Sequence, residues 1–185
     1  MVYYLILDGK MISFNGVAGV RTLFLRCIAL TYAIAFYSIY TQIPGLYGDN
    51  GILPASGQIK AEHLDKAGSL LEALWRNPSL LYLAPSLGLS VTQMMELLCL
   101  LGTLLGLALT LKPAYCTKPA FFLMWASYLS LCKAGNAFLW FQWEGLLNEV
   151  GFLTIILAPT ITGYHKTSLS QDQISLFLVR WLLFR

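Results

Sequence analysis

The chain has 185 residues, of which 57% are hydrophobic and only 11% are charged, and its mean hydropathy is +0.66. A soluble domain carries about 25% charged residues, so this composition excludes a polar shell, and we expect a lipid bilayer to cover much of the surface. The net charge of +3 is small and the basic residues are scattered, which argues against nucleic-acid binding, where basic residues form a stripe.

The first elements in chain order are an atypical N-terminal segment over residues 1–20 and a spanning helix over residues 23–43. The segment opens with an apolar run that is too short for a cleavable signal peptide, so the helix is expected to act as an uncleaved anchor. It has the roughly 20 apolar residues that a span needs. Arg26 is expected to extend toward the headgroups. Ala29 and Ala33 would let another helix approach closely.

A long polar connection over residues 41–90 follows this helix. It carries three basic and four acidic residues, whereas the next connection carries Lys112 and Lys118 without an acidic residue. Because basic residues accumulate on the cytosolic side of membrane proteins, we expect the N-terminus and the second connection in the cytosol. The connection over residues 41–90 is then expected to face the lumen.

Within the luminal connection, five apolar residues fall on one face of a predicted helix: Ala67, Leu70, Leu71, Leu74 and Trp75. This spacing indicates an amphipathic helix on the membrane surface. Packing of the same helix against the spanning bundle is an equally good interpretation. Trp75 is the position from which we expect contact with a luminal client protein.

The second spanning helix is predicted over residues 91–111. Ser90 and Gln93 have the spacing of a capping box. Gly102 and Gly106 form a GxxxG pair, which suits close helix packing in lipid but is common by chance in apolar segments.

Three further apolar helices are predicted over residues 119–133, 142–159 and 174–185. The aromatic residues between the first two are expected to form a belt at the membrane interface. The last helix stops at Arg185 without a cap, glycine or proline, so we expect the sequence to be a truncated piece of a longer chain. The predicted fold class is an all-α, multi-pass transmembrane helical bundle over residues 21–185, with four spanning helices and the start of a fifth.

The most distinctive run directly follows the first helix. It reads QIPGLYGDNGILPA and contains Pro44, Gly45, Gly48, Gly51 and Pro54. Glycine permits positive φ and proline fixes φ, so this composition specifies one backbone path. Two interpretations stay open, a structured turn that leaves the membrane and a contact site for lipid or for a client.

Charged residues inside or beside the apolar segments are the other functional candidates, because such groups usually face a bundle interior or a cavity. They are Glu96, Lys133, Glu144 and Glu149. The helix dipole stabilises carboxylates in a first turn, which accounts for Glu144. Glu149 lies deeper, where an ion pair with Lys133 would neutralise both charges. A ligand-binding or proton-transfer role and plain exposure are the alternatives.

We predict no catalytic, cofactor-binding or metal site. The four cysteines have no CxxC spacing and lie far in sequence from both histidines, which argues against zinc and a disulfide framework. No nucleophile–base motif or phosphate-binding loop is present in the sequence. The cysteines are interpreted as small buried hydrophobic residues.

Four stretches resemble the lipase maturation factor family and occur in that family's order: residues 42–55, 92–98, 138–153 and 179–185. The third reads FLWFQWEGLLNEVGFL and contains the further candidates Gln142, Trp143, Glu144 and Glu149. The resemblance covers residues 21–185 and is specific as a set. It looks closer to the second member of the family than to the first, and residues 1–20 do not share it.

The resemblance implies a multi-pass protein of the endoplasmic reticulum membrane with a large luminal C-terminal region. It implies a non-enzymatic role in the folding, assembly and export of secreted lipases and related luminal proteins. Two alternatives stay open. One is a membrane-embedded enzyme, on a remote likeness in helix layout to the vitamin K-dependent carboxylase group, and the other is an inactive truncated fragment. A transporter is disfavoured, because such folds repeat helix groups and this sequence does not.

Overall fold

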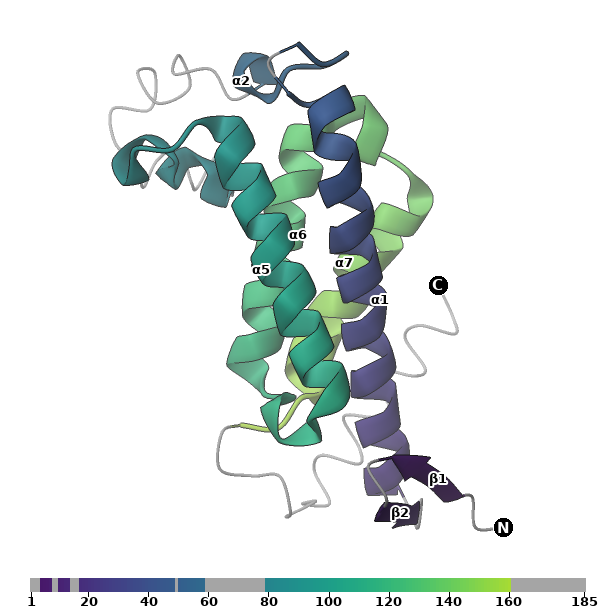
Figure 1. Cartoon of the computed structure of the whole chain (residues 1–185). Coiled ribbons are helices and arrows are strands. Elements are labelled where there is room, and N and C mark those ends of the chain that lie inside the picture. The colour runs from purple at the N-terminus through teal and green to yellow at the C-terminus, as the bar shows by residue number, and fades with distance from the viewer. Residues whose placement is uncertain (1–3, 8–9, 14–16, 49, 59–78, 161–185) are drawn as a thin grey trace.

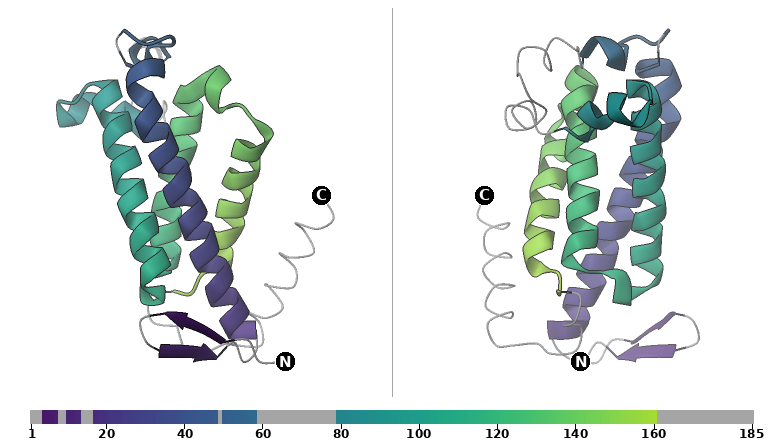
Figure 2. Two further views of the ribbon diagram at one scale, coloured as in Figure 1. Left: turned by 45° about the vertical axis from the view of Figure 1, so that its right-hand side comes forward. Right: turned by 90° about the vertical axis from the view of Figure 1, so that its left-hand side faces the viewer.

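The structure is a computed structural model that describes residues 4–7, 10–13, 17–48, 50–58 and 79–160. In this part of the chain, four long helices lie side by side (Figures 1 and 2): α1 (Val17–Leu46), α5 (Val91–Leu111), α6 (Lys118–Gly135) and α7 (Gln142–Leu157). Helices that follow one another in this order run in opposite directions (Figure 1). The ends of α1 and α6 therefore lie at the same end of the bundle as the starts of α5 and α7.

Short elements lie at both ends of this bundle (Figure 1). The short helical elements are α2 (Ala55–Gln58), η1 (Leu80–Leu83), η2 (Pro85–Leu87), η3 (Pro113–Tyr115) and η4 (Asn136–Leu139). At the end where α1 begins, β1 (Tyr4–Leu7) pairs antiparallel with β2 (Lys10–Ser13). This hairpin lies in the atypical segment over residues 1–20, outside residues 21–185, for which the all-α bundle was predicted.

Small residues bring α1 and α5 together. A Cβ atom on Gly106 would lie 2.8 Å from the carbonyl oxygen of Ala29 and 2.9 Å from the Cβ atom of Ala33. A Cβ atom on Gly102 would lie 2.6 Å from the ring of Phe36. Gly106 thus packs on the alanine pair of α1 and Gly102 packs on Phe36, which is the close approach that small residues permit between helices in lipid.

Side chains form hydrogen bonds with backbone groups at both ends of α5. The backbone N–H of Gln93 donates to Ser90 Oγ (3.2 Å) and that of Ser90 donates to Gln93 Oε1 (3.0 Å), which completes the predicted capping box. At the other end, Arg26 Nε donates to the carbonyl of Thr110 (2.7 Å). The sequence indicated that Arg26 extends toward the headgroups; it instead binds the last turn of α5, where the helix dipole favours a cation.

Among the described helices, two are long and apolar enough to cross a membrane, namely Gly19–Leu46 with 28 residues and Val91–Leu111 with 21 residues. Large apolar side chains are exposed on both, such as Ile34 at 62% and Leu111 at 69%. Surface of this kind is unfavourable in water, so lipid is the solvent that suits these helices. Trp75 and the predicted helices around it and over residues 174–185 lie outside the described residues.

We expect Cys116, in the connection between α5 and α6, to resist alkylation. Its side chain is buried, its Sγ lies 3.4 Å from the carbonyl oxygen of Leu109, and burial raises the pKa of the thiol to about 11. Because the thiolate is the nucleophile, little of it is present at pH 8. Alkylation by iodoacetamide should be at least about tenfold slower than at a cysteine placed at the exposed Ala114. Equal labelling rates by mass spectrometry would show that Cys116 is accessible.

A second prediction concerns the place where α7 meets α1. The Tyr32 hydroxyl donates to the carbonyl of Leu147 (3.0 Å), and a Cβ atom on Gly151 would overlap that hydroxyl. Gly151→Ala is therefore expected to destabilise the bundle by about 1–3 kcal/mol. Adding Tyr32→Phe should recover part of the loss, because it removes the overlapping oxygen.

The matched control is Gly145→Ala on the same helix, since nothing lies within 4 Å of a Cβ atom there. It should be neutral or stabilising, because alanine favours helix over glycine by roughly 1 kcal/mol. Thermal unfolding in detergent measures all three effects. Equal melting temperatures for the two alanine variants would contradict the close contact.

Candidate functional site

The distinctive run after the first helix folds back on the end of α1. Pro44 lies in the last turn, where its missing N–H removes only one helical hydrogen bond. The carbonyl of Ile43 then accepts from the backbone N–H groups of Tyr47 (2.8 Å) and Gly48 (2.9 Å). For this reason α1 continues to Leu46 instead of ending at the predicted residue 43.

Backbone hydrogen bonds tie the rest of the run to the helix end. The N–H of Leu53 donates to the carbonyl of Leu46 (2.8 Å), and the N–H of Ala55 donates to that of Tyr47 (3.0 Å). Pro54 is half-buried directly before α2. The run is therefore a compact, hydrogen-bonded turn, which supports the first of the two interpretations given to its composition.

Two glycines of this turn have no room for a side chain. A Cβ atom on Gly48 would lie 2.7 Å from the carbonyl oxygen of Pro44, and one on Gly51 would lie 2.7 Å from that of Leu46. Nothing lies within 4 Å of a Cβ atom placed on Gly45. Because the neighbours of Gly48 and Gly51 are backbone atoms, no rotamer change can relieve the contact.

Tyr47 anchors the turn on α6 and η4. Its hydroxyl donates to the carbonyl of Gly135 (3.2 Å), and its ring lies edge-on to Phe138 with 6.4 Å between centroids. Burial, and to a lesser extent the nearby Cys132 and Glu144, raises the pKa of the Tyr47 phenol to about 12. The hydroxyl therefore stays protonated and keeps its donor role at neutral pH.

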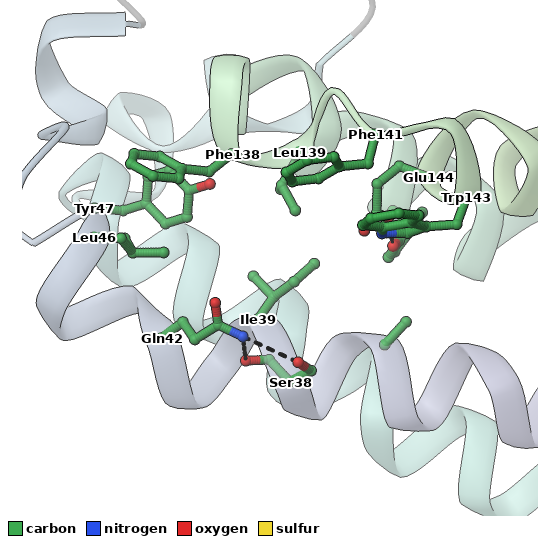
Figure 3. Close-up of a pocket in the computed structure, with 12 residues that line it drawn as sticks. Ser38, Ile39, Gln42, Leu46, Tyr47, Phe138, Leu139, Phe141, Trp143 and Glu144 are labelled. Atoms are coloured by element: carbon green, nitrogen blue, oxygen red, sulfur yellow. Dashed lines mark hydrogen bonds between the residues drawn. The ribbon is translucent and has the colours of Figure 1, made fainter.

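A pocket of about 270 Å³ lies between the C-terminal half of α1 and the segment formed by η4 and the start of α7. Figure 3 shows its two walls, with Ile39 and Gln42 on α1 facing Phe141 and Trp143 across the space. The residues that line it are Ala35, Ser38, Ile39, Gln42, Leu46, Tyr47, Tyr128, Phe138, Leu139, Phe141, Trp143 and Glu144.

Glu144 is the one charged residue among these lining residues. It lies in the first turn of α7, and the hydroxyl of Tyr128 donates to its Oε2 atom. Tyr128 is 1% exposed and its ring meets those of Tyr32 and Phe36 edge-on, with 5.4 Å between centroids in each case. The donor is thus held in place by packed aromatic rings, and it fixes the carboxylate at the pocket wall.

Aromatic rings form the outer wall of the pocket. The rings of Phe141 and Trp143 stack with 4.6 Å between centroids and 12° between planes, and the side chains are 48% and 63% exposed. On the opposite wall, Gln42 Nε2 donates to the carbonyl (3.0 Å) and the hydroxyl (3.1 Å) of Ser38. The pocket therefore combines apolar ring faces with one carboxylate and a few neutral polar groups.

The other sequence candidates lie outside the pocket lining. Gln142 is exposed beside it, and Lys133 is exposed in the last turn of α6. Glu149 is half-buried on α7 and Glu96 is half-buried on α5. The ion pair suggested between Lys133 and Glu149 stays a prediction. The Glu144 carboxylate of α7 accepts a hydrogen bond from the Tyr128 hydroxyl.

Sequence reasoning selected none of Tyr128, Tyr47 and Phe138 as a site residue, although Tyr47 lies in the distinctive run and Phe138 in the predicted aromatic belt. A phenol inside an apolar helix needs a hydrogen-bond partner when it is buried, and that rule was the available signal for Tyr128. Its partner Glu144 is 16 positions away in the sequence, and nothing local relates the two residues.

Metal-ligating side chains do not gather in the described part of the chain. No three His, Cys, Asp or Glu residues there are placed to hold a metal ion. All four cysteines lie in that part and each is a free thiol. The groups that line the pocket are the Glu144 carboxylate, hydroxyl and amide groups, and aromatic faces.

Comparison with known proteins decides the family of the chain. A family model described as "Lipase maturation factor transmembrane domain" matches residues 19–185. The chain belongs to the lipase maturation factor family. The match begins in the first turn of α1 and leaves out the β1–β2 hairpin.

Named relatives agree with this assignment. This lipase maturation factor chain is 42% identical over 174 residues to Lipase maturation factor 2 of Homo sapiens, an alignment that covers 89% of the chain and 24% of that protein. It is 44% identical over 167 residues to Lipase maturation factor 2 of Xenopus tropicalis, covering 89% and 23%. With Lipase maturation factor 1 of Mus musculus the identity is 32% over 169 residues, covering 89% and 29%. The predicted greater likeness to the second member is confirmed.

The chain spans about a quarter of the length of the curated relatives that it matches. No solved structure matches it.

Proposed function

We propose that this lipase maturation factor chain works in the endoplasmic reticulum membrane and assists the folding, assembly and export of secreted lipases and related luminal proteins. The observation that carries the proposal is the family match over residues 19–185. The relatives are named maturation factors for lipases, which supports a role in assistance and not in catalysis. The bilayer and luminal lipase clients are the partners in this proposal.

In this proposal α6 and α7 cross the membrane together with α1 and α5. At about 1.5 Å per residue, their 18 and 16 residues span about 27 and 24 Å, near the roughly 30 Å of a hydrocarbon core. Both expose large apolar side chains, such as Leu123 at 56% and Phe152 at 50%. Lipid accommodates such side chains at lower cost than water does.

The charge distribution supports a cytosolic N-terminus and a luminal connection over residues 41–90. Glycosylation mapping tests this, with a short Gly/Ser cassette carrying Asn-Gly-Ser inserted either after the exposed Gly57 or after the exposed Ala114. We expect a glycan on the first insertion alone. A glycan on the second alone would reverse the orientation, and glycans on both would contradict the multi-pass arrangement.

The role in maturation is tested by secretion of an active lipase. Cells that lack the endogenous factor receive a full-length relative in which residues 19–185 of this chain replace the matching segment. We expect secreted lipase activity well above the empty-vector level. A chimera that is stable and resides in the endoplasmic reticulum membrane but leaves secretion at that level would contradict the proposal.

A further inference from the structure

We infer that the pocket between α1 and α7 binds the quaternary ammonium headgroup of a choline phospholipid. This site goes beyond lipase maturation and does not depend on which client the protein serves. The inference rests on three features of the described residues, which are the charge of the pocket, the nature of its walls and its size and position.

The charge of the pocket favours a cationic ligand. Glu144 is the single charged group of the lining, and the partner that holds its Oε2 atom is the neutral hydroxyl of Tyr128. A carboxylate attracts a cation by Coulomb interaction, and more strongly where the carboxylate is partly shielded from water. The start of α7 contributes a partial positive charge, but it does not fill the space beside the carboxylate. A cationic ligand complements this lining, whereas the carboxylate would repel an anionic ligand.

The walls favour a cation that lacks N–H groups. Phe141 stacks on Trp143 at the outer wall, and Tyr47 meets Phe138 edge-on at one end of the pocket, on the left in Figure 3. Aromatic faces attract cations, and aromatic cages are the usual receptors for quaternary ammonium groups. A primary ammonium brings three donors that need acceptors, while nine of the twelve residues that line the pocket are aromatic or aliphatic. A trimethylammonium group needs no acceptor, so it fits these walls better.

The size and position of the pocket favour a lipid headgroup over a whole small molecule. Its volume of about 270 Å³ lies below the roughly 300–1,000 Å³ of typical ligand pockets. Trp143 and Phe141 are exposed at the rim, and the adjacent Trp140 is 81% exposed. Tryptophan residues concentrate at headgroup level in membrane proteins. The acyl chains would then lie outside the pocket, against exposed apolar residues of α1 such as Ile34.

The test is retention of lipid by the 185-residue chain. The chain is reconstituted in nanodiscs of equal phosphatidylcholine, phosphatidylethanolamine and phosphatidylglycerol, released in mild detergent, and weighed by native mass spectrometry. We expect one retained phosphatidylcholine per chain, in at least about fivefold excess over either other lipid, since cation–π contacts favour the quaternary group. Equal retention of phosphatidylglycerol would overturn a cation site. Equal retention of phosphatidylethanolamine would overturn the preference for a quaternary ammonium.

Variants locate the retained lipid. Glu144→Gln removes the charge and keeps the shape, so retention of phosphatidylcholine should fall about tenfold. Trp143→Leu should also lower it. The matched controls are Trp140→Leu, an exposed tryptophan outside the lining, and Glu96→Gln, a half-buried carboxylate on α5; both should retain lipid as the original chain does.

Thermal unfolding of each variant separates lost binding from lost folding. If Glu144→Gln does not fold, the inference is still tested by Trp143→Leu and by the comparison of the three lipids in the unmodified chain. Unchanged retention in a folded Glu144→Gln or Trp143→Leu variant would overturn the inference. An unmodified chain that retains no phosphatidylcholine would do so as well.

Discussion

Replacing Gly106 with leucine is expected to separate α1 from α5 and to unfold the bundle at a much lower temperature. The nearest neighbours of a Cβ atom at this position are the backbone oxygen of Ala29 at 2.8 Å and the Cβ atom of Ala33 at 2.9 Å. Neither can move without moving α1 as a whole. Overpacking costs about 1–3 kcal/mol where side chains can adjust, so the upper end of that range or more is expected here.

Thermal unfolding in detergent and the monodisperse fraction in size-exclusion chromatography measure this effect. Gly145→Leu is the matched control, because it makes the same substitution on an exposed helix surface with nothing within 4 Å of the added Cβ atom. That control should unfold close to the temperature of the unmodified chain. A Gly106→Leu variant as stable as the control would show that the two helices are farther apart than the structure has them.

The second large effect is expected for Gly51→Ala in the turn after α1. The added Cβ atom would lie 2.7 Å from the carbonyl oxygen of Leu46 and 3.0 Å from the backbone nitrogen of Gly48. Backbone atoms fill both positions, so the turn must open. Opening would release Tyr47 from the carbonyl of Gly135 and remove one wall of the pocket. We expect a loss of about 1–3 kcal/mol in stability.

Limited proteolysis detects this change directly, because cleavage between residues 46 and 58 should become faster while cleavage elsewhere does not. Gly45→Ala is the control, since nothing lies within 4 Å of a Cβ atom there. Equal cleavage of the two variants would mean that the turn is not held by the contacts described. In the lipase-secretion assay, the comparison of Gly51→Ala with Gly45→Ala shows whether this turn matters for maturation.

Local sequence signals accounted for the helices well. Residues 91–111 match α5 because an apolar run, a capping box at Ser90 and a Lys-Pro stop all act within a few residues of each other. The end of α1 was placed too early because proline usually stops a helix, whereas here the carbonyl of Ile43 finds donors in the following turn. The β1–β2 hairpin has no comparable local signal.

The pocket could not be predicted in the same way, because its parts come from distant places in the sequence. Glu144 was a candidate for its charge and for its place in a stretch that resembles the family, but its contact with Tyr128 and the facing wall from Gln42 depend on how α1, α6 and α7 pack. The GxxxG pair is an intermediate case. Gly106 and the alanine pair of α1 each indicated close packing, but only the structure shows that they pack on each other.

Alkaline carbonate extraction of microsomes tests most directly whether bilayer hydrocarbon surrounds this helical bundle. The exposed apolar faces of α1 and α5 predict that the chain stays in the membrane pellet together with a known multi-pass protein. Release of the chain into the supernatant as a folded, monodisperse species would contradict the account, because its apolar surface would then have a protein or aqueous environment in place of lipid.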